Sequence, residues 1–123
     1  MSRSKKLSSN FTVMPRDANH YGNVHGGIIM LSADNLAYTL ASQYCRTNVV
    51  TASVKEVSFL APVRVGDLVI MDAEICRVGN SSLDVNVRIR GERLKSGEIF
   101  EVADAKFVMV AVDEDGKPTR FDR

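Results

Sequence analysis

The feature that most constrains the fold of this chain is an apolar run at residues 28–44, which follows a polar, glycine-rich turn. The run contains neither proline nor glycine and consists of good or tolerable helix formers, so it predicts one long α-helix. A helix of about 18 residues spans roughly 27 Å, which is the width of a small domain. Apolar side chains lie on nearly all sides of it, a pattern typical of a helix that the rest of the fold surrounds. It is too polar and too short to cross a membrane.

The remaining sequence has the pattern of a β-sheet. Residues 81–93 alternate most regularly, with apolar side chains such as Leu83 on one face and polar ones such as Asp84 on the other. Short turn sequences such as Gly79-Asn80 separate the strands after the helix. Because consecutive strands with short connections pair antiparallel, we expect an α+β fold with a five-stranded antiparallel sheet around a central helix. The five strands are predicted at residues 7–13, 49–60, 68–78, 81–93 and 99–112.

Length and composition are those of one globular domain, residues 1–123. The hydrophobic fraction is 45%, and we expect residues 1–6 and 119–123 to be flexible. A formal net charge of +1 argues against nucleic acid or an acidic membrane as a partner. No apolar run of signal-peptide length follows the first residues, and Cys45 and Cys76 lack metal-ligand spacing. We therefore expect a cytoplasmic protein with reduced thiols and no metal site. The open sheet edges predict a homo-oligomer.

Glycine pairs frame the start of the predicted helix, at Gly22-Asn23 and Gly26-Gly27. Glycine permits tight turns and lets backbone N–H groups approach a ligand closely. The first N–H groups of a helix have no intrahelical partner and carry the positive end of the helix dipole. They could therefore receive a developing oxyanion, such as the oxygen of an attacked carbonyl. The alternative is that the glycines only fit a crowded bend before the helix.

Asp34 is the only charged residue of the predicted helix. A carboxylate on a buried helix costs free energy unless it is paired or serves a function. It lies about 10 Å along the axis from Gly27, too far to assist chemistry at the helix start of its own chain. Two helices running antiparallel across a dimer would bring Asp34 of one subunit to Gly27 of the other, as a general base. The alternative is a structural hydrogen-bond network with Ser32, Asn35 or a neighbouring strand.

Other reactive groups give weaker signals. His25 could take part in acid–base chemistry, although a histidine near a helix start is more often a structural donor. His20 more often lies in a solvated loop. Neither Cys45 nor Ser32 has the setting of a nucleophile, and the sequence contains no Walker loop or dinucleotide fingerprint. The helix start therefore remains the place where chemistry is expected.

Residues 19–27, Asn-His-Tyr-Gly-Asn-Val-His-Gly-Gly, resemble a motif of the hot-dog-fold acyl-CoA thioesterases. The most similar branch holds the bacterial broad-range acyl-CoA hydrolases and the brain-type cytosolic acyl-CoA hydrolase. Further segments match the pattern of that family in the same order, and the resemblance extends over residues 14–118. These segments are residues 49–51, 59–63, 65–67, 79–82, 110–113 and 115–118.

This resemblance implies a hot-dog fold, in which an antiparallel sheet wraps a central helix. It also implies a homodimer with active sites at its interface, commonly assembled into a homohexamer as a trimer of dimers. The thioester carbonyl of acyl-CoA would meet the helix start, with Gly27 as oxyanion donor, Asn23 as the catalytic polar residue of the loop and Asp34 as the acidic residue of the helix. Coenzyme A is then part of the substrate, and no separate cofactor is expected. The expected substrate contacts are His25, Gly26, Thr51, Ser53, Ser81, Ser82 and Asn86.

One position departs from the family pattern. Many members have aspartate where this chain has Asn23, and asparagine can serve neither as base nor as nucleophile. It can orient a water molecule or the carbonyl, so the base would be Asp34 of the facing subunit. We therefore expect an acyl-CoA thioester hydrolase of fatty acid metabolism. Two alternatives stay open: a non-catalytic acyl-CoA-binding sensor, and an enoyl-CoA hydratase or dehydratase that pairs His25 with Asp34.

Overall fold

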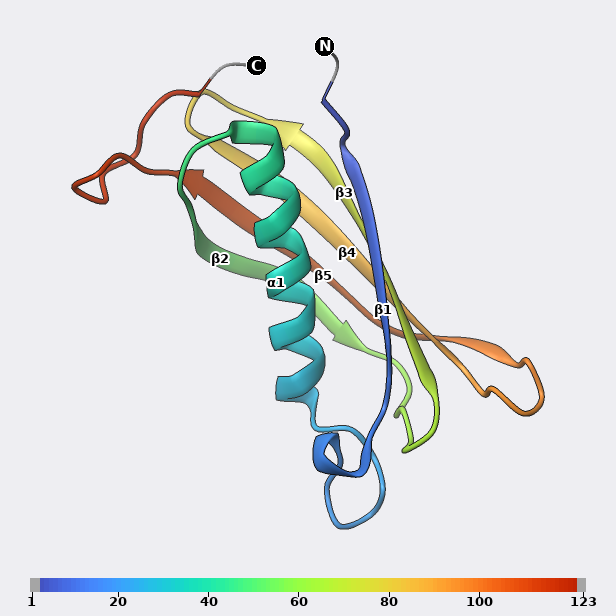
Figure 1. Ribbon diagram of the computed structural model, residues 1–123. Coiled ribbons are helices and arrows are strands. Elements are labelled where there is room, and N and C mark those ends of the chain that lie inside the picture. Colours follow the sequence, from blue (N-terminus) through green and yellow to red (C-terminus); the bar gives the residue numbers. More distant parts are fainter. Residues whose placement is uncertain (1–2, 122–123) are drawn as a thin grey trace.

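The computed structural model describes residues 3–121 as one long helix lying on one face of a five-stranded antiparallel sheet (Figure 1). This is the hot-dog arrangement, so the predicted fold class is confirmed. Each observed strand agrees with its predicted range to within one residue at either end. The elements in chain order are β1 (Lys6–Thr12), the 3-10 turn η1 (Pro15–Asp17), α1 (Gly26–Cys45), β2 (Val49–Phe59), β3 (Leu68–Val78), β4 (Ser82–Glu92) and β5 (Ile99–Ala111).

The strand order in the sheet is β1-β3-β4-β5-β2. Only β3, β4 and β5 follow one another as hairpins, whereas β2 pairs with β5 and therefore occupies the edge opposite β1. The sequence predicted that the connection from the second to the third strand would be a hairpin-scale turn. Instead, residues 60–67 run from one side of the sheet to the other, past the start of α1. The order of the strands puts β2 at an edge whose outer side has no strand partner among the described residues.

The core lies between α1 and the sheet. Helix residues Ala33, Ala37 and Ala41 are fully buried, and their small side chains let the helix lie close to the strands. The sheet contributes alternate residues from its inner face, as the period of two predicts. On β4 these are Leu83, Val85, Val87 and Ile89, all with at most 1% of their surface exposed.

Helix α1 begins two residues earlier than predicted and ends one residue later. His25 is the N-cap residue, with extended backbone, and its carbonyl oxygen accepts from the N–H groups of Ile28 and Ile29 at 3.0 and 3.4 Å. Gly26 and Gly27 therefore form the first helical turn, where glycine is tolerated because those N–H groups need no intrahelical partner. Arg46 ends the helix in the left-handed conformation, and its N–H donates to the carbonyl of Ser42.

The two ends of the described chain meet at the carboxyl end of α1, as Figure 1 shows. Arg3 donates to the carbonyl oxygen of Tyr44 at 2.6 Å and lies over its ring, and the ring of Phe121 contacts Tyr44 edge to face. A cation at this place also complements the negative end of the helix dipole. Part of the segments expected to be flexible, residues 1–2 and 122–123, lies outside the described residues.

Two bulges interrupt the pairing of β2 with β5, between Thr51 and Ser53 and between Lys55 and Ser58. At the second bulge Glu56 has a φ of 54°, in the left-handed region. For a residue with a Cβ this conformation costs about 1–2 kcal/mol relative to the ordinary regions. The side chain of Glu56 does not offset this cost. Its ion pair with Lys106 is exposed and therefore contributes little to stability.

We expect Glu56→Gly to raise the free energy of unfolding by about 0.5–1 kcal/mol, because glycine adopts the left-handed region without the Cβ penalty. Lys55→Gly is the matched control: it places glycine at the neighbouring residue, where φ is not positive, and should lower stability. Urea unfolding of the three proteins measures both effects. A loss of stability in Glu56→Gly equal to that in Lys55→Gly would contradict the strain at this bulge.

Candidate functional site

The loop before α1 is folded around Asn19. The Oδ1 atom of its side chain accepts from the N–H groups of Tyr21 and Asn23 at 2.9 and 3.2 Å, and its carbonyl accepts from Gly22. Gly22 has a φ of 82°, which a residue with a Cβ rarely adopts. The glycine of the predicted turn is therefore required by the backbone at this position, and the loop leads the chain into the helix in a defined direction.

The same loop is attached to the connection between β2 and β3. Val24 donates to the carbonyl of Val63 at 2.8 Å, and Val65 donates to the carbonyl of Gly22 at 3.1 Å. Asn23 lies between these two contacts, half-buried and bridged to Arg64. The motif at residues 19–27 and the segment at residues 59–63 are far apart in sequence, and the fold brings them together at the helix start.

Gly26 and Gly27 present the first N–H groups of α1 at an exposed surface. A Cβ added to Gly27 would meet no atom within 4 Å, whereas a Cβ added to Gly26 would contact the ring of Phe59 at 3.6 Å. The helix start is thus open to a ligand on the side of Gly27. His25 is exposed, and its side chain makes no capping hydrogen bond to the helix. The predicted oxyanion donor therefore has both the free N–H direction and the space that the chemistry needs.

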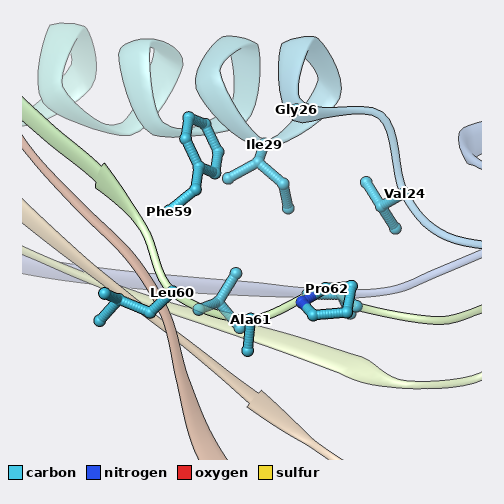
Figure 2. Close-up of a pocket in the computed structure, with 9 residues that line it drawn as sticks. Val24, Gly26, Ile29, Phe59, Leu60, Ala61 and Pro62 are labelled. Atoms are coloured by element: carbon cyan, nitrogen blue, oxygen red, sulfur yellow. The ribbon is translucent and has the colours of Figure 1, made fainter.

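A cavity of about 310 Å³ lies directly beside these N–H groups (Figure 2). In Figure 2 the ring of Phe59 stands against the helix next to Ile29, and Leu60, Ala61 and Pro62 form the wall on the other side. None of the lining side chains is charged, so the cavity suits an apolar group. The lining residues are Val24, Gly26, Ile29, Phe59, Leu60, Ala61, Pro62, Val63 and Val102.

Asp34 is half-buried and accepts a hydrogen bond at 2.6 Å from the hydroxyl of Thr51 on β2. Thr51 pairs with Met109 of β5, whose sulfur is 3.5 Å from the same hydroxyl. This contact is the bond to a neighbouring strand that the sequence left as one of two alternatives for Asp34. It also orients the carboxylate, since one oxygen is held by Thr51 and the second, Oδ2, can accept from another group. The two predicted residues Asp34 and Thr51 are therefore brought together.

An apolar surface extends from α1 to the edge strand β2. Leu31 and Tyr38 on the helix and Val54 and Val57 on the strand are exposed. Several exposed apolar side chains beside an unpaired strand edge are typical of a subunit interface. Asp34 and Thr51 lie between the helix and strand parts of this surface.

The other predicted contact residues lie away from the helix start. Ser53 pairs with Val108 and Asn86 pairs with Lys106, on the sheet face opposite α1. Ser82 accepts a hydrogen bond from Arg77 at 3.0 Å, and Ser81 lies in the turn before β4. Within one chain, the structure therefore does not bring Ser53, Ser81, Ser82 and Asn86 together with Gly27 and Asp34.

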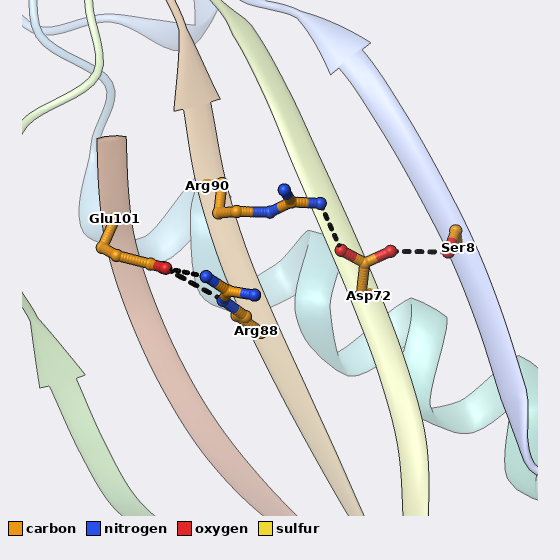
Figure 3. Close-up of polar contacts among 5 residues, drawn as sticks. All are labelled: Ser8, Asp72, Arg88, Arg90 and Glu101. Carbon is orange, nitrogen blue, oxygen red and sulfur yellow. Dashed lines mark hydrogen bonds and ion pairs between the residues drawn. The ribbon is translucent and has the colours of Figure 1, made fainter. Parts of the chain in front are cut away.

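The outer face of the sheet is held by polar contacts between strands (Figure 3). Asp72 of β3 accepts from Ser8 of β1 at 2.6 Å and from Arg90 of β4 at 2.8 Å. Arg88 of β4 pairs with Glu101 of β5. Of the causes that shift the pKa of Asp72, the hydrogen bond from Ser8 is the largest; together with Arg90 it holds this pKa below its usual value despite partial burial. The alternation of β4 predicted a polar outer face, and these hydrogen bonds and ion pairs connect neighbouring strands across that face.

Groups that could support other chemistry are not assembled in the described part of the chain. Burial raises the pKa of the Cys45 thiol to about 11, so it stays protonated and is a poor nucleophile. Within residues 3–121 no group of three or more His, Cys, Asp or Glu side chains is placed to hold a metal ion. Over the same residues, no helix is long and apolar enough to span a membrane.

Comparison with known proteins gives consistent results. The sequence model of the Thioesterase superfamily matches residues 21–98. Protein VdlD of Helicobacter pylori is 40% identical over 114 residues, which is 93% of this chain and 65% of VdlD. The chain thus spans just under two thirds of the length of that relative.

Solved structures match over almost the whole chain. An acyl-CoA hydrolase of Staphylococcus aureus, in complex with butyryl coenzyme A and coenzyme A, is 33% identical with a TM-score of 0.88, over 95% of this chain and 71% of that one. A hexameric thioesterase of Yersinia pestis is 33% identical with a TM-score of 0.88, over 94% of this chain and 93% of that one. At 33% identity, these proteins are similar to the present chain in sequence as well as in fold.

Variants of the Staphylococcus aureus hydrolase have also been characterised, in which one asparagine, one aspartate or one threonine is replaced by alanine. The asparagine precedes the aspartate by 15 residues, and the threonine follows the aspartate by 17. In the present chain Asn19, Asp34 and Thr51 have the same two spacings. The sequence pointed to Asn19 only as part of a motif, and an asparagine four residues before another in a glycine-containing turn was the signal that could have singled it out.

We expect Asp72→Asn to lower the free energy of unfolding near neutral pH and to have less effect in acid. A carboxyl whose pKa is depressed by folding stabilises the native state above its unfolded pKa of about 4, and this contribution is lost as pH falls through the folded value. Unfolding curves at pH 7, 5, 4 and 3 measure it, and Ser8→Ala should give a smaller change of the same sign. A constant difference between wild type and Asp72→Asn at all four pH values would contradict this assignment.

Proposed function

The chain belongs to the thioesterase superfamily, and from this membership and the geometry of the helix start we propose that it hydrolyses acyl-CoA to free coenzyme A and a carboxylic acid. The observation that carries the proposal is the juxtaposition at residues 26–27 of uncommitted helical N–H groups with an uncharged cavity. A thioester substrate has the matching parts, namely a carbonyl oxygen that becomes negative and an apolar acyl chain. We place this reaction in the cytoplasm, where free thiols such as Cys45 and Cys76 stay reduced.

The N–H groups at the helix start stabilise the charge that develops in the reaction. Water adds to the carbonyl carbon, and the carbonyl oxygen becomes an oxyanion that accepts from the N–H of Gly27. When the carbonyl re-forms, the C–S bond breaks, and coenzyme A leaves as a thiolate that takes up a proton. Preorganised donors of this kind are worth about 10²–10³ in rate. The positive end of the helix dipole acts in the same direction.

Asp34 is the base that removes the proton from the attacking water. Its distance along the axis from Gly27, about 10 Å, means that it serves the helix start of a facing subunit. Thr51 supports this role because its hydroxyl occupies one carboxylate oxygen and fixes the direction of the other. The proton passes from water to Asp34 and then to the departing thiolate, so the carboxylate is regenerated in each turnover.

Two asparagines of the loop act as positioning groups. Asn19 is supported by its spacing from Asp34, which matches that of the asparagine replaced in the Staphylococcus aureus hydrolase. Since its Oδ1 atom accepts from the loop, its amide NH₂ is the end that can donate to the substrate carbonyl or to water. Asn23 lies in the same loop and is the second group that we assign to orienting the reactants.

The active unit is a homodimer, joined through the exposed apolar surface of α1 and β2, and a homohexamer is its full assembly. The surface supports this because it surrounds Asp34 and Thr51, which one subunit alone does not bring to a helix start. The Yersinia pestis relative is described as hexameric. In such an assembly four polar residues would contact the coenzyme A part of a substrate bound to another subunit, namely Ser53, Ser81, Ser82 and Asn86. His25 and Gly26 would contact the thioester end of that substrate.

The comparisons give less support to a hydratase or dehydratase, because the similar solved structures are described as an acyl-CoA hydrolase and a thioesterase. That reaction needs His25 and Asp34 to act together, and the facing-subunit arrangement proposed above would bring Asp34 to the helix start that His25 caps. A sensor without catalysis would use the same cavity, and an assay of free thiol release from acyl-CoAs of two to sixteen carbons distinguishes it. Saturable thiol release supports the hydrolase, and binding without release contradicts it.

We expect Asp34→Asn to lower kcat by about 100-fold or more, the usual size of a general-base contribution, with no change in oligomeric state. Thr51→Val, which removes only the hydroxyl that orients Asp34, should lower kcat less, and Thr51→Ser should restore most of the rate. Thiol release and light scattering after gel filtration measure the two properties. Full activity in Asp34→Asn would show that the base lies elsewhere.

We expect Gly27→Ala to separate stability from activity. The added Cβ meets no atom of its own chain within 4 Å and glycine is a poor helix former, so the free energy of unfolding should rise by up to about 1 kcal/mol. The same methyl group obstructs the close approach of the carbonyl to the N–H, so kcat/KM should fall by about 10-fold or more. Asn35→Ala, at an exposed site of the same helix, is the control that should leave kcat/KM unchanged. Unaltered kcat/KM in Gly27→Ala would contradict the oxyanion assignment.

A further inference from the structure

Phe59 occupies a special place in the cavity beside the helix start. Its ring lies against Gly26, close enough that a Cβ on this glycine would be 3.6 Å from the ring. Its side chain is also 53% exposed, so the core does not enclose the ring. Figure 2 shows the ring reaching up to the helix beside Ile29, at one side of the cavity. A large side chain with one free side at the boundary of a cavity can limit what enters it.

The second bulge of β2 is what directs Phe59 to this place. Across the bulge Lys55 pairs with Lys106, whereas Ser58 pairs with Asp104, so Glu56 and Val57 together oppose one residue of β5. Phe59 then pairs with Ala103, which is buried on the helix side of the sheet. Without the extra residue, the alternation of the strand would turn Phe59 to the opposite face. The strained φ of Glu56 is therefore linked to the position of the ring.

The carbonyl position determines which part of a substrate meets Phe59. A carbonyl oxygen that accepts from the helix start lies next to Gly26, and Gly26 itself lines the cavity. One of the two groups attached to that carbonyl therefore continues into a space bounded by Ile29, Phe59 and Leu60. In a thioester these two groups are the acyl chain and the sulfur of coenzyme A, and the uncharged lining matches the hydrocarbon of the acyl chain.

We infer that Phe59, held over Gly26 by the β2 bulge at Glu56, is the residue that sets the acyl-chain-length preference of this protein. This inference rests on the proposed function and adds to it the side chain that closes the acyl cavity. Chains that end before the ring are bound along their whole length, and longer chains must displace the ring or leave their ends in water.

Three variants test this inference with acyl-CoAs of two to sixteen carbons. Phe59→Ala should move the maximum of kcat/KM to chains at least two carbons longer. Each further methylene that the cavity buries should contribute about fourfold, so the preference for long over short chains should rise by about 10-fold or more. Phe59→Leu should shift the maximum in the same direction by less, and it keeps the assay interpretable if Phe59→Ala does not fold. Phe59→Trp should shift the maximum to shorter chains.

Ile99→Ala is the matched control, because Ile99 is also 53% exposed but lies outside the cavity, at the start of β5. Calorimetric binding of non-hydrolysable thioether analogues of the same chain lengths runs in parallel. If wild type releases no thiol, the proposed function fails, and the binding profile still decides whether Phe59 sets the chain length. Profiles of the Phe59 variants that match wild type and Ile99→Ala, in both turnover and binding, would overturn the inference.

Discussion

The close packing of α1 on the inner face of the sheet is the interaction on which the rest of the structure depends. Ala33, Ala37 and Ala41 have no exposed surface, and small side chains at these spacings let the helix lie near the apolar residues of β4 and β5. This contact fixes both ends of the helix. Its start is held over residues 60–67, where the cavity forms, and its end receives Arg3 and Phe121.

The same helix that forms the core also carries the groups to which we assign the proposed chemistry, on a different face. Its first N–H groups are exposed, and Asp34 meets Thr51 where the helix adjoins the edge strand β2. This side of α1 is not covered by the sheet, and its apolar residues, together with those of β2, form the surface that we assign to a second subunit. In the proposed dimer, separating a buried face from a face that a partner completes would allow a domain of 123 residues to hold a core and half of a site at once.

The two faces of the sheet have distinct roles for the same physical reason. Because side chains alternate along a strand, β4 sends its apolar residues to α1 and its charged residues to the outer face, where Arg90 and Arg88 pair with neighbouring strands. The bulges of β2 are the exception to this alternation. One of these bulges determines on which face of the strand Phe59 lies. Because the ring of Phe59 lies against Gly26, this bulge also affects the shape of the cavity.

The sequence by itself determined the helix and the five strands, because periodicity and turn residues are local signals, and its glycine pairs predicted chemistry at the helix start. It also identified Asp34 as exceptional, since a single charge on an apolar helix needs an explanation. Only the tertiary structure decided that β2 lies at the edge beside β5, that Thr51 is the residue bonded to Asp34, and that Ser53 and Asn86 are on the far face. It also placed Phe59 over Gly26 and showed how Asn19 holds its loop. These facts depend on strand order, bulges and contacts between distant segments, none of which a local pattern specifies.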